Sequence, residues 1–327
     1  MGTIVSMERR TFLGGLTGLF AYAGGAGLPL VAREFDPQLF AKRGEWERLN
    51  INSIVLKIGA TSPFSVLHIS DTHLAAAYLH ESAAKQYLAK IRNEQFGGRQ
   101  EEALRDSLDW AKTHVDYVIH TGDLIDFQSE ANYDLVKKYL GANVLGTMGN
   151  HEYSPEMWLT KPAPSNNEAW KDRYRDKLAS VYPFDVTFSS KVVNGVNFVM
   201  LDDVFGTVTA GQVERFGKEV AKGLPIVLCL HVPFYTDNIA TANSHYWLKN
   251  GGPFRSAQTP DPSGDWKSQL SDATTSDFIA YLKGEPLLKA ILAGHLHINI
   301  QDRFSPTAME YVVGGNYMFA GQELLIS

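Results

Sequence analysis

Cysteine is nearly absent from this chain, which has only Cys229 among its 327 residues. This scarcity excludes an internal disulfide and a zinc site built from cysteines. Cys229 lies within the apolar run 227–230, so we expect it to be a small buried hydrophobic residue. Basic charge is also scarce, because 30 lysines and arginines stand against 36 acidic residues, which gives a formal net charge of −6. Such a balance disfavours the broad basic surface that binds long nucleic acids.

Strongly hydrophobic long runs are missing as well. The longest uncharged stretch, residues 11–32, is rich in glycine and alanine and directly follows the pair Arg9 and Arg10. Paired arginines before a weakly apolar segment are typical of a twin-arginine export signal. The glycines make this stretch too weakly hydrophobic for us to expect a stable membrane span. We therefore predict that residues 1–32 are a removable signal read by the twin-arginine export machinery, with an uncleaved anchor or a plain helix as alternatives. The mature protein would then be periplasmic or extracellular.

The rest of the chain has the composition of a globular protein, with 44% hydrophobic and 20% charged residues. We predict a linker and leading strand over residues 33–62 and one α/β domain over residues 63–327. The Asn194-Gly195 dipeptide between two apolar runs predicts a β-hairpin. Alternating strands and helices in the first half, with hairpins later, favour mixed rather than purely parallel sheets. Helices are expected by periodicity and end signals at 82–96, 100–114, 130–140, 168–181 and 211–222.

Two segments, Tyr153–Asn167 and Tyr235–Ser271, do not follow the regular pattern. Loops of this length in compact domains are usually functional or disordered. Each follows a strand that ends in a candidate ligand, so both are candidate walls of a substrate pocket. The second segment carries residues that either contact a base, sugar or phosphate or anchor the loop to the body: His245, Tyr246, Trp247, Arg255 and Trp266.

Five short apolar runs each end in residues that commonly bind metals. Oxygen and imidazole donors collected at one end of several strands suit a pair of hydrolytic metal ions. Open α/β sheets place their sites at the carboxyl ends of strands, which fits this arrangement. In chain order the five groups are Asp71-Thr-His73, Gly122-Asp123, Gly149-Asn150-His151-Glu152, His231 and Gly294-His295-Leu-His297.

This ordered set resembles the calcineurin-like metallophosphoesterases, whose five sequence blocks are all intact here. The resemblance implies an αββα sandwich, with two mixed β-sheets flanked by helices and a dinuclear metal site at the strand ends. It implies that one metal is held by Asp71, His73, Asp123 and His297. The second metal would be held by Asp123, Asn150, His231 and His295, with Asp123 as the bridging ligand. The donor set accepts Mn, Fe, Zn, Co or Ni without indicating which.

The resemblance also assigns two residues beside the ligands. His151 is expected to be the general acid for the leaving oxygen. The alternative is a histidine that contacts the metal ligands and takes no part in proton transfer. Asp126 matches a carboxylate that orients this histidine in some relatives, and the alternative is a simple acid at a helix start. Glu152 is expected to have a structural hydrogen-bonding role. His68 and His120, inside strands, are expected to be satisfied interior residues.

Departures from two related groups narrow the expected substrate. Purple acid phosphatases have a tyrosine where this chain has Asp126, so a charge-transfer ferric site is not expected. Protein Ser/Thr phosphatases have arginines where Phe127 and Met148 stand here, which disfavours a phosphoprotein substrate. We therefore expect hydrolysis of a small phosphoric mono- or diester by a metal-activated water. The alternative from another class is a non-catalytic metal-binding scaffold for a protein partner, which would be expected to have lost ligands or His151.

Overall fold

A computed structural model describes residues 48–141, 143–154, 167–250 and 272–327. Every described residue belongs to one compact unit. The predicted export signal lies outside the described residues, as do Arg255 and Trp266 and the side chains of Tyr246 and Trp247. Within the described part, no helix combines the length and the apolar character needed to cross a membrane.

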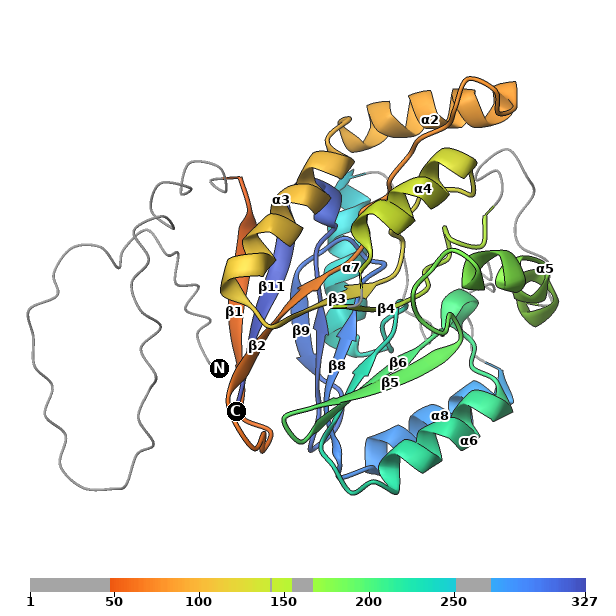
Figure 1. Ribbon diagram of the computed structural model, residues 1–327. Coiled ribbons are helices and arrows are strands. Elements are labelled where there is room, and N and C mark those ends of the chain that lie inside the picture. Colours follow the sequence, from red (N-terminus) through yellow and green to blue (C-terminus); the bar gives the residue numbers. More distant parts are fainter. Residues whose placement is uncertain (1–47, 142, 155–166, 251–271) are drawn as a thin grey trace, which may run out of the picture. The chain divides into compact units, whose positions relative to one another are not determined.

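The first sheet has five strands and mixes parallel with antiparallel pairs (Figure 1). The edge strand Asn50–Leu56 pairs in parallel with Ala320–Ile326. Ala320–Ile326 in turn pairs antiparallel with Phe64–Ile69. Phe64–Ile69 and the remaining two strands are parallel, as expected where helices connect them. In spatial order the strands are β1 (Asn50–Leu56), β11 (Ala320–Ile326), β2 (Phe64–Ile69), β3 (Tyr117–Thr121) and β4 (Val144–Thr147).

The second sheet has six strands and begins with the predicted hairpin. Asn194 and Gly195 both have positive φ, 45° and 78°, which is the geometry of a tight type I′ turn between paired strands. Four central strands are parallel and the last pair is antiparallel. In spatial order the strands are β5 (Phe188–Val193), β6 (Val196–Leu201), β7 (Ile226–Cys229), β8 (Leu288–Ala293), β10 (Met309–Val312) and β9 (Ile300–Arg303).

The two sheets pack face to face over one apolar core. Val66 and Ile119 from the first sheet belong to the same buried cluster as Phe198 and Leu292 from the second. These residues alternate along their strands with others that face the helices, as the two-residue period of a strand requires. Cys229 lies in this core with no exposed surface, as its apolar surroundings predict.

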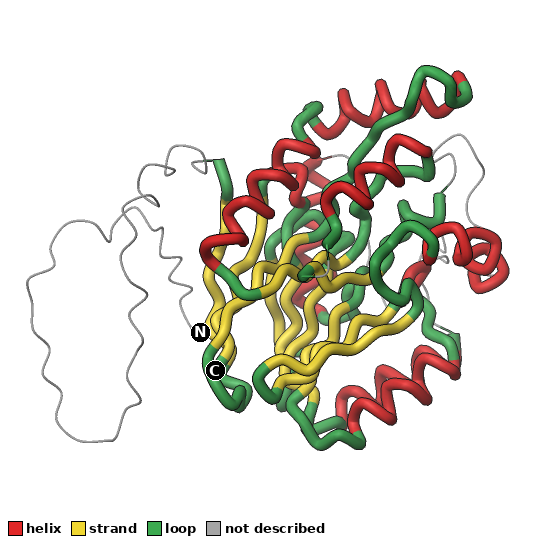
Figure 2. Tube along the Cα trace, viewed as in Figure 1, coloured by secondary structure: helices red, strands yellow, loops and turns green. Residues whose placement is uncertain are grey.

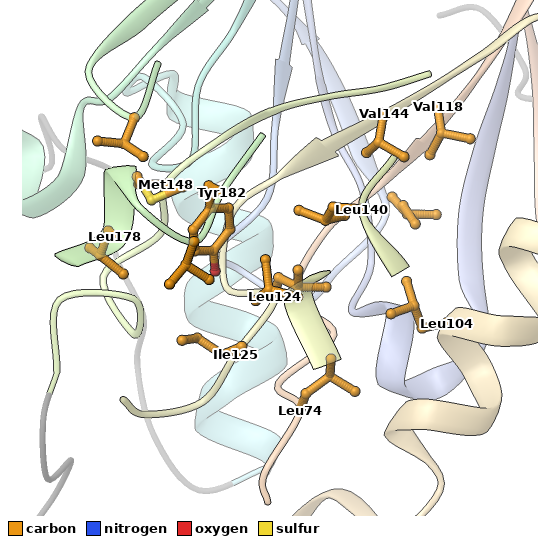
Figure 3. Close-up of a cluster of buried hydrophobic side chains, with 14 of the residues drawn as sticks. Leu74, Leu104, Val118, Leu124, Ile125, Leu140, Val144, Met148, Leu178 and Tyr182 are labelled. Atoms are coloured by element: carbon orange, nitrogen blue, oxygen red, sulfur yellow. The ribbon is translucent and has the colours of Figure 1, made fainter. Parts of the chain in front are cut away.

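Helices cover the outer faces of both sheets, so the predicted two-sheet α/β architecture is confirmed (Figures 1 and 2). Figure 3 shows the cluster over the first sheet, where Leu104 packs with Val118 and Val144. Phe216 and Phe278 fill the same role on the second sheet. The helices are α2 (Ala83–Phe96), α3 (Gln100–His114), α4 (Glu130–Tyr139), α5 (Asn167–Ala179), α6 (Ala210–Val220), α7 (Asp237–Asn250) and α8 (Ala273–Gly284).

The segment 235–271 differs from its expected irregular form. Residues 237–250 form the helix α7, and Ile239 from this helix is fully buried in the core of the second sheet. His245 on α7 is exposed. The following helix α8 was not anticipated from the sequence either, although Asp272 caps it by accepting a hydrogen bond from Thr275 N. Both helices have weak apolar periodicity, and packing against the sheet decides their conformation.

Candidate metal centre

The predicted ligands lie just beyond the carboxyl ends of strands from both sheets. β2 ends at Ile69 just before Asp71, and β3 ends at Thr121 just before Asp123. β7 and β8 of the second sheet end shortly before His231 and His295. Because the sheets pack face to face, these ends converge, and three groups of buried residues that could hold metal ions result: Asp71, His73 and His297; His73, Asp123 and His151; Asp123, His231 and His295.

The first group places one carboxylate between two imidazoles. Asp71 Oδ1 lies 3.2 Å from His297 Nε2 and 3.9 Å from His73 Nε2. The two Nε2 atoms lie 3.0 Å apart. Asp71 Oδ1 is buried and accepts no hydrogen bond, whereas Oδ2 accepts one of 2.8 Å from His295 N. A buried carboxylate oxygen without a hydrogen bond is costly, so a cation is the fitting partner for Oδ1.

In the group of Asp123, His231 and His295, the two histidines lie around Asp123 Oδ2. His231 Nε2 lies 3.3 Å from this oxygen and also 3.3 Å from His295 Nδ1. Asn150 Oδ1 approaches the same His231 nitrogen at 3.2 Å. Metal–nitrogen bonds of about 2.1 Å separate neighbouring ligand atoms by about 3.0–3.4 Å, so these spacings suit a shared cation. The structure thus brings all seven predicted ligands into one connected cluster.

Asp123 and His73 each belong to two of the three groups, and Asp123 is the shared carboxylate. His73 Nε2 approaches Asp123 Oδ2 at 3.8 Å and His151 Nε2 approaches it at 3.9 Å. Its other oxygen, Oδ1, accepts a hydrogen bond of 2.9 Å from His151 N. One oxygen of Asp123 is therefore held by the backbone, and the other faces the histidines from both sheets.

Several of these residues have an unusual backbone conformation. Asp71, His73 and Asp123 each have a φ of 54°, and His295 and His297 have 65° and 57°. They are five of the eight non-glycine residues with positive φ in the described part of the chain. This left-handed region costs energy for residues with a Cβ atom, and such strain persists at functional sites where the surroundings enforce it.

Glycines before the ligands allow the strand ends to approach one another closely. A Cβ atom on Gly149 would lie 2.1 Å from Asp123 Oδ1, and one on Gly294 would lie 1.9 Å from Ser70 Oγ. Both distances are far inside van der Waals contact. The Gly-Asn-His-Glu and Gly-His-x-His blocks therefore need glycine for steric reasons at the point where two strands deliver their ligands.

Protonation states of the buried groups also suit a cation. Burial lowers the pKa of His73 to about 4 and that of His295 to about 3, with neighbouring imidazolium charge adding to the effect, so both rings are neutral donors. At Asp123, burial would raise the pKa, but His231 and His151 hold it well below its usual range. His231 is the exception, because Asp123 overcomes burial and raises its pKa to about 10. A cation must displace a proton there.

His151 and Asp126 form the predicted pair. His151 Nδ1 lies 3.0 Å from Asp126 Oδ1 and 2.8 Å from the Asp126 carbonyl oxygen. Burial disfavours the charged form of His151, yet Asp123 and Asp126 outweigh it and raise its pKa to about 9. Asp126 is fully buried and accepts hydrogen bonds, so it is not a simple acid at a helix start.

The supporting residues include some that the sequence did not single out. Arg92 of α2 is 3% exposed and donates to Asp126, and Tyr317 Oη lies 3.4 Å from His297 Nδ1. Asp203 Oδ1 accepts hydrogen bonds from the backbone nitrogens of His231 and Val232. One signal in the sequence could have indicated that Arg92 is buried. Arg92 lies four residues after Leu88 and four before Phe96, so it shares the apolar face of the helix.

Two strand histidines have the interior roles expected for them. His68 is fully buried between Gln322 Oε1 at 3.2 Å and Thr121 Oγ1 at 2.9 Å. His120 is also buried and contacts Thr72 Oγ1 at 2.9 Å. Neither belongs to a group of residues that could hold a metal within the described chain.

A family model described as calcineurin-like phosphoesterase matches residues 64–299. No curated protein sequence matches the chain. Among solved structures, the chain is similar to a dimetal phosphatase from Danio rerio, with 14% identity, a TM-score of 0.46 and coverage of 80% of this chain and 91% of the other. A structure of PhoD has 14% identity and a TM-score of 0.45, with 81% and 59% of the two chains covered.

A 5'-nucleotidase from Candida albicans has 11% identity and a TM-score of 0.36 over 80% of this chain, which spans only 47% of that protein. These likenesses are distant, whereas the family model covers well over half of the sequence, including all five ligand blocks. The chain therefore belongs to the calcineurin-like phosphoesterase family.

Proposed function

We propose that this protein hydrolyses a phosphoric mono- or diester of a small molecule at a dinuclear metal centre. Asp71, His73, Asp123 and His297 hold one ion in this proposal. Asp123, Asn150, His231 and His295 hold the other. The two ions, when bound, supply activation of the attacking water and neutralise charge on the phosphoryl group. The observation that carries the proposal is the convergence of buried carboxylates and imidazoles from both sheets into three overlapping groups, two of which contain Asp123.

His151 is the general acid of this proposal. Its Nδ1 is engaged by Asp126, so its Nε2 faces the cluster, 3.9 Å from Asp123 Oδ2. With a raised pKa the imidazole is protonated at neutral pH and can pass a proton from Nε2 to the leaving oxygen. The same charge stabilises the phosphoryl oxygens as the bond to the leaving group breaks.

The positions next to the ligands support a small substrate. Phe127 and Met148 are both fully buried in apolar surroundings, so neither position offers a cation to a phosphate on a protein surface. The chain's net charge of −6 likewise disfavours a long polyanion as substrate.

The test is turnover of a generic phosphomonoester and a generic phosphodiester by metal-loaded protein. His151→Ala removes the proposed general acid, and Asp123→Asn removes the carboxylate that both sets of proposed ligands would share. His80→Ala is the matched control, because His80 is an exposed histidine paired with Glu130. We expect the wild type and the control to hydrolyse at least one ester, and both site variants to lose at least a hundredfold in kcat.

Turnover that persists in Asp123→Asn would contradict the proposed site. If the metal-loaded wild type hydrolyses neither ester nor any member of a panel of phosphorylated metabolites, the scaffold alternative replaces the enzyme proposal. The same assay compares the two ester classes and so identifies the preferred one.

We also propose that residues 1–32 direct export by the twin-arginine machinery and that residues 63–327 form the catalytic domain. The support is the arginine pair before a weakly apolar, uncharged stretch. Arg9→Lys/Arg10→Lys should retain the protein in the cytoplasm of a twin-arginine-competent bacterium, whereas Arg33→Lys should not. Export of the paired variant at the wild-type level would contradict this proposal.

A further inference from the structure

Helix α2 supplies no predicted ligand, yet it carries a charged residue into the interior beside the site. Arg92 is 3% exposed, and the residues one helical turn before and after it, Leu88 and Phe96, are 0% and 9% exposed. These three residues form one stripe on the helix, because positions four apart share a face. A buried arginine in such a stripe is costly unless its charge is paired.

The partner of Arg92 is the Asp126 carboxylate. Arg92 Nε donates to Asp126 Oδ2 at 2.6 Å, and Arg92 Nη2 donates to Asp126 Oδ1 at 2.8 Å. This is the two-pronged contact between a planar guanidinium and a carboxylate, which sets the carboxylate's orientation as well as its charge. A lysine could supply the charge but not the fork.

The Asp126 carboxylate in turn contacts two histidine rings and fixes their orientation. Its Oδ1 lies 2.9 Å from His73 Nδ1 and 3.0 Å from His151 Nδ1. A carboxylate accepts hydrogen bonds, so each ring presents Nδ1–H to Asp126 and directs Nε2 to the opposite side. His73 Nε2 then faces His297 Nε2 at 3.0 Å, and His151 Nε2 faces Asp123 Oδ2 at 3.9 Å.

Phe96 adds a second restraint from the same helix stripe. Its ring stacks on the His73 ring, with the centroids 4.4 Å apart and the planes inclined by 16°. The Arg92 guanidinium carbon lies 4.6 Å from the centroid of the Phe96 ring. His73 is thus held at its edge by Asp126 and on its face by Phe96, and Arg92 contacts both supports.

We propose that Arg92 is a positioning residue that locks Asp126 between His73 and His151, so that one arginine aligns a metal ligand and the general acid together. This inference rests on the proposed function for the role of His151. Its effect on metal binding through His73 does not depend on which ester is hydrolysed. Nothing in the five ligand blocks specifies this arginine, because it lies in the segment between the first two blocks.

The experiment compares full-length variants in two assays, metal affinity by calorimetric titration of the metal-free protein and steady-state hydrolysis. Arg92→Met removes the charge but keeps much of the side-chain length, and Arg92→Lys keeps the charge without the fork. Asp126→Asn and the double variant Arg92→Met/Asp126→Asn close a double-mutant cycle. Arg99→Met is the matched control, because Arg99 lies over the Phe319 ring at 4.6 Å and pairs with Glu102 on the surface.

We expect Arg92→Met to weaken metal binding by about tenfold to a hundredfold, the usual effect of losing an outer partner of a ligand. We expect kcat to fall while KM changes little. The fall should be larger for an alkyl ester than for a 4-nitrophenyl ester, because only the poorer leaving group needs the proton from His151. Arg92→Lys should lie between Arg92→Met and the wild type, and Arg99→Met should match the wild type.

If Arg92 acts through Asp126, the double-mutant cycle should show that the two losses are not additive. The double variant should be no worse than Asp126→Asn alone, in affinity and in kcat. Additive losses would overturn the inference, and so would wild-type metal affinity with an unchanged leaving-group dependence in Arg92→Met. Should Arg92→Met not fold, because Asp126 then lacks its counter-charge, the comparison of Arg92→Lys with the wild type and of the double variant with Asp126→Asn decides the matter.

The two proposals fail in different ways. A wild type that binds metal but hydrolyses no ester contradicts the proposed function, while the affinity measurements still decide the role of Arg92. If the Arg92→Met variant hydrolyses an ester as fast as the wild type and binds metal with equal affinity, the positioning role is overturned. The proposed function then remains intact.

Discussion

The Glu152 carboxylate accepts a hydrogen bond of 2.9 Å from the backbone nitrogen of Asp123. Its two oxygens also accept from the backbone nitrogens of Leu124, Ile125 and Gly149. The last residue of the Gly-Asn-His-Glu block thus binds the loop that carries Asp123. This is the structural hydrogen-bonding role expected for Glu152, and it joins the ends of β3 and β4.

Glu152→Gln should destabilise the protein and disturb the site. The amide group has one acceptor oxygen in place of two, so at least one buried N–H loses its partner, and the charge-assisted bonds weaken. We expect a loss of about 3 kcal/mol in the free energy of unfolding and a lower kcat. Thermal unfolding and turnover measure the two effects. Glu130→Gln, which changes an exposed acid, should alter neither, and an unchanged melting temperature in Glu152→Gln would contradict this account.

Gly294→Ala should abolish the site, whereas Gly284→Ala should be harmless. The new Cβ at 294 would lie 1.9 Å from Ser70 Oγ and 2.5 Å from Asp71 Oδ2, so the strand ends must separate. At Gly284 nothing lies within 4 Å, and its φ is not positive. We expect the first variant to lose about 3 kcal/mol of stability and its metal binding. The second should change stability by less than about 1 kcal/mol. Denaturant unfolding and metal titration test both, and equal behaviour would refute the steric argument.

Metal binding should raise the thermal stability of the wild type. A ligand at 1,000 times its Kd that binds only the folded state stabilises it by about 4 kcal/mol. Chelation should therefore lower the melting temperature by about 10 °C, taking about 2–4 °C per kcal/mol for a domain of this size. Asp123→Asn should show a much smaller shift, because both candidate groups that contain Asp123 lose a charged ligand. An equal shift in both proteins would argue against this site.

Glu81 should contribute stability that disappears in acid. Its burial would raise its pKa, but the backbone N–H groups of Tyr78, Glu130 and Ala131 and the Lys85 ammonium lower the pKa below its ordinary value of 4.5. A lowered pKa in the folded state stabilises the protein above the unfolded-state pKa and loses effect as the pH falls through the folded-state pKa. Glu81→Gln should therefore cost about 1 kcal/mol at pH ~7.

The difference between Glu81→Gln and the wild type should shrink steadily as the pH drops below about 4. Denaturant unfolding at several pH values measures it. Glu94→Gln is the control, because Glu94 lies exposed on the same helix α2. A cost that stays constant down to pH ~2 would assign the effect to packing rather than to charge.

Local signals in the sequence were sufficient for much of the fold. The helix predicted over 100–114 is α3 with the same bounds, and the Asn194-Gly195 turn joins β5 to β6 as expected. These features depend on neighbours in the chain, on apolar periodicity and on the positive φ that Asn and Gly tolerate. The helices α7 and α8 were not anticipated, because burial of Ile239 and Phe278 against the second sheet outweighs weak local preferences.

The sequence by itself determined which donors are present and that each follows a strand. Asp71, Asp123 and His295 could therefore be named before any contact between them was known. Only the tertiary structure decided how they meet, because the two sheets must pack before residues 224 positions apart, such as Asp71 and His295, come within a hydrogen bond. The same holds for Arg92, whose charge is buried by a helix packing over Asp126. Such contacts depend on burial and long-range packing, which no local pattern of residues encodes.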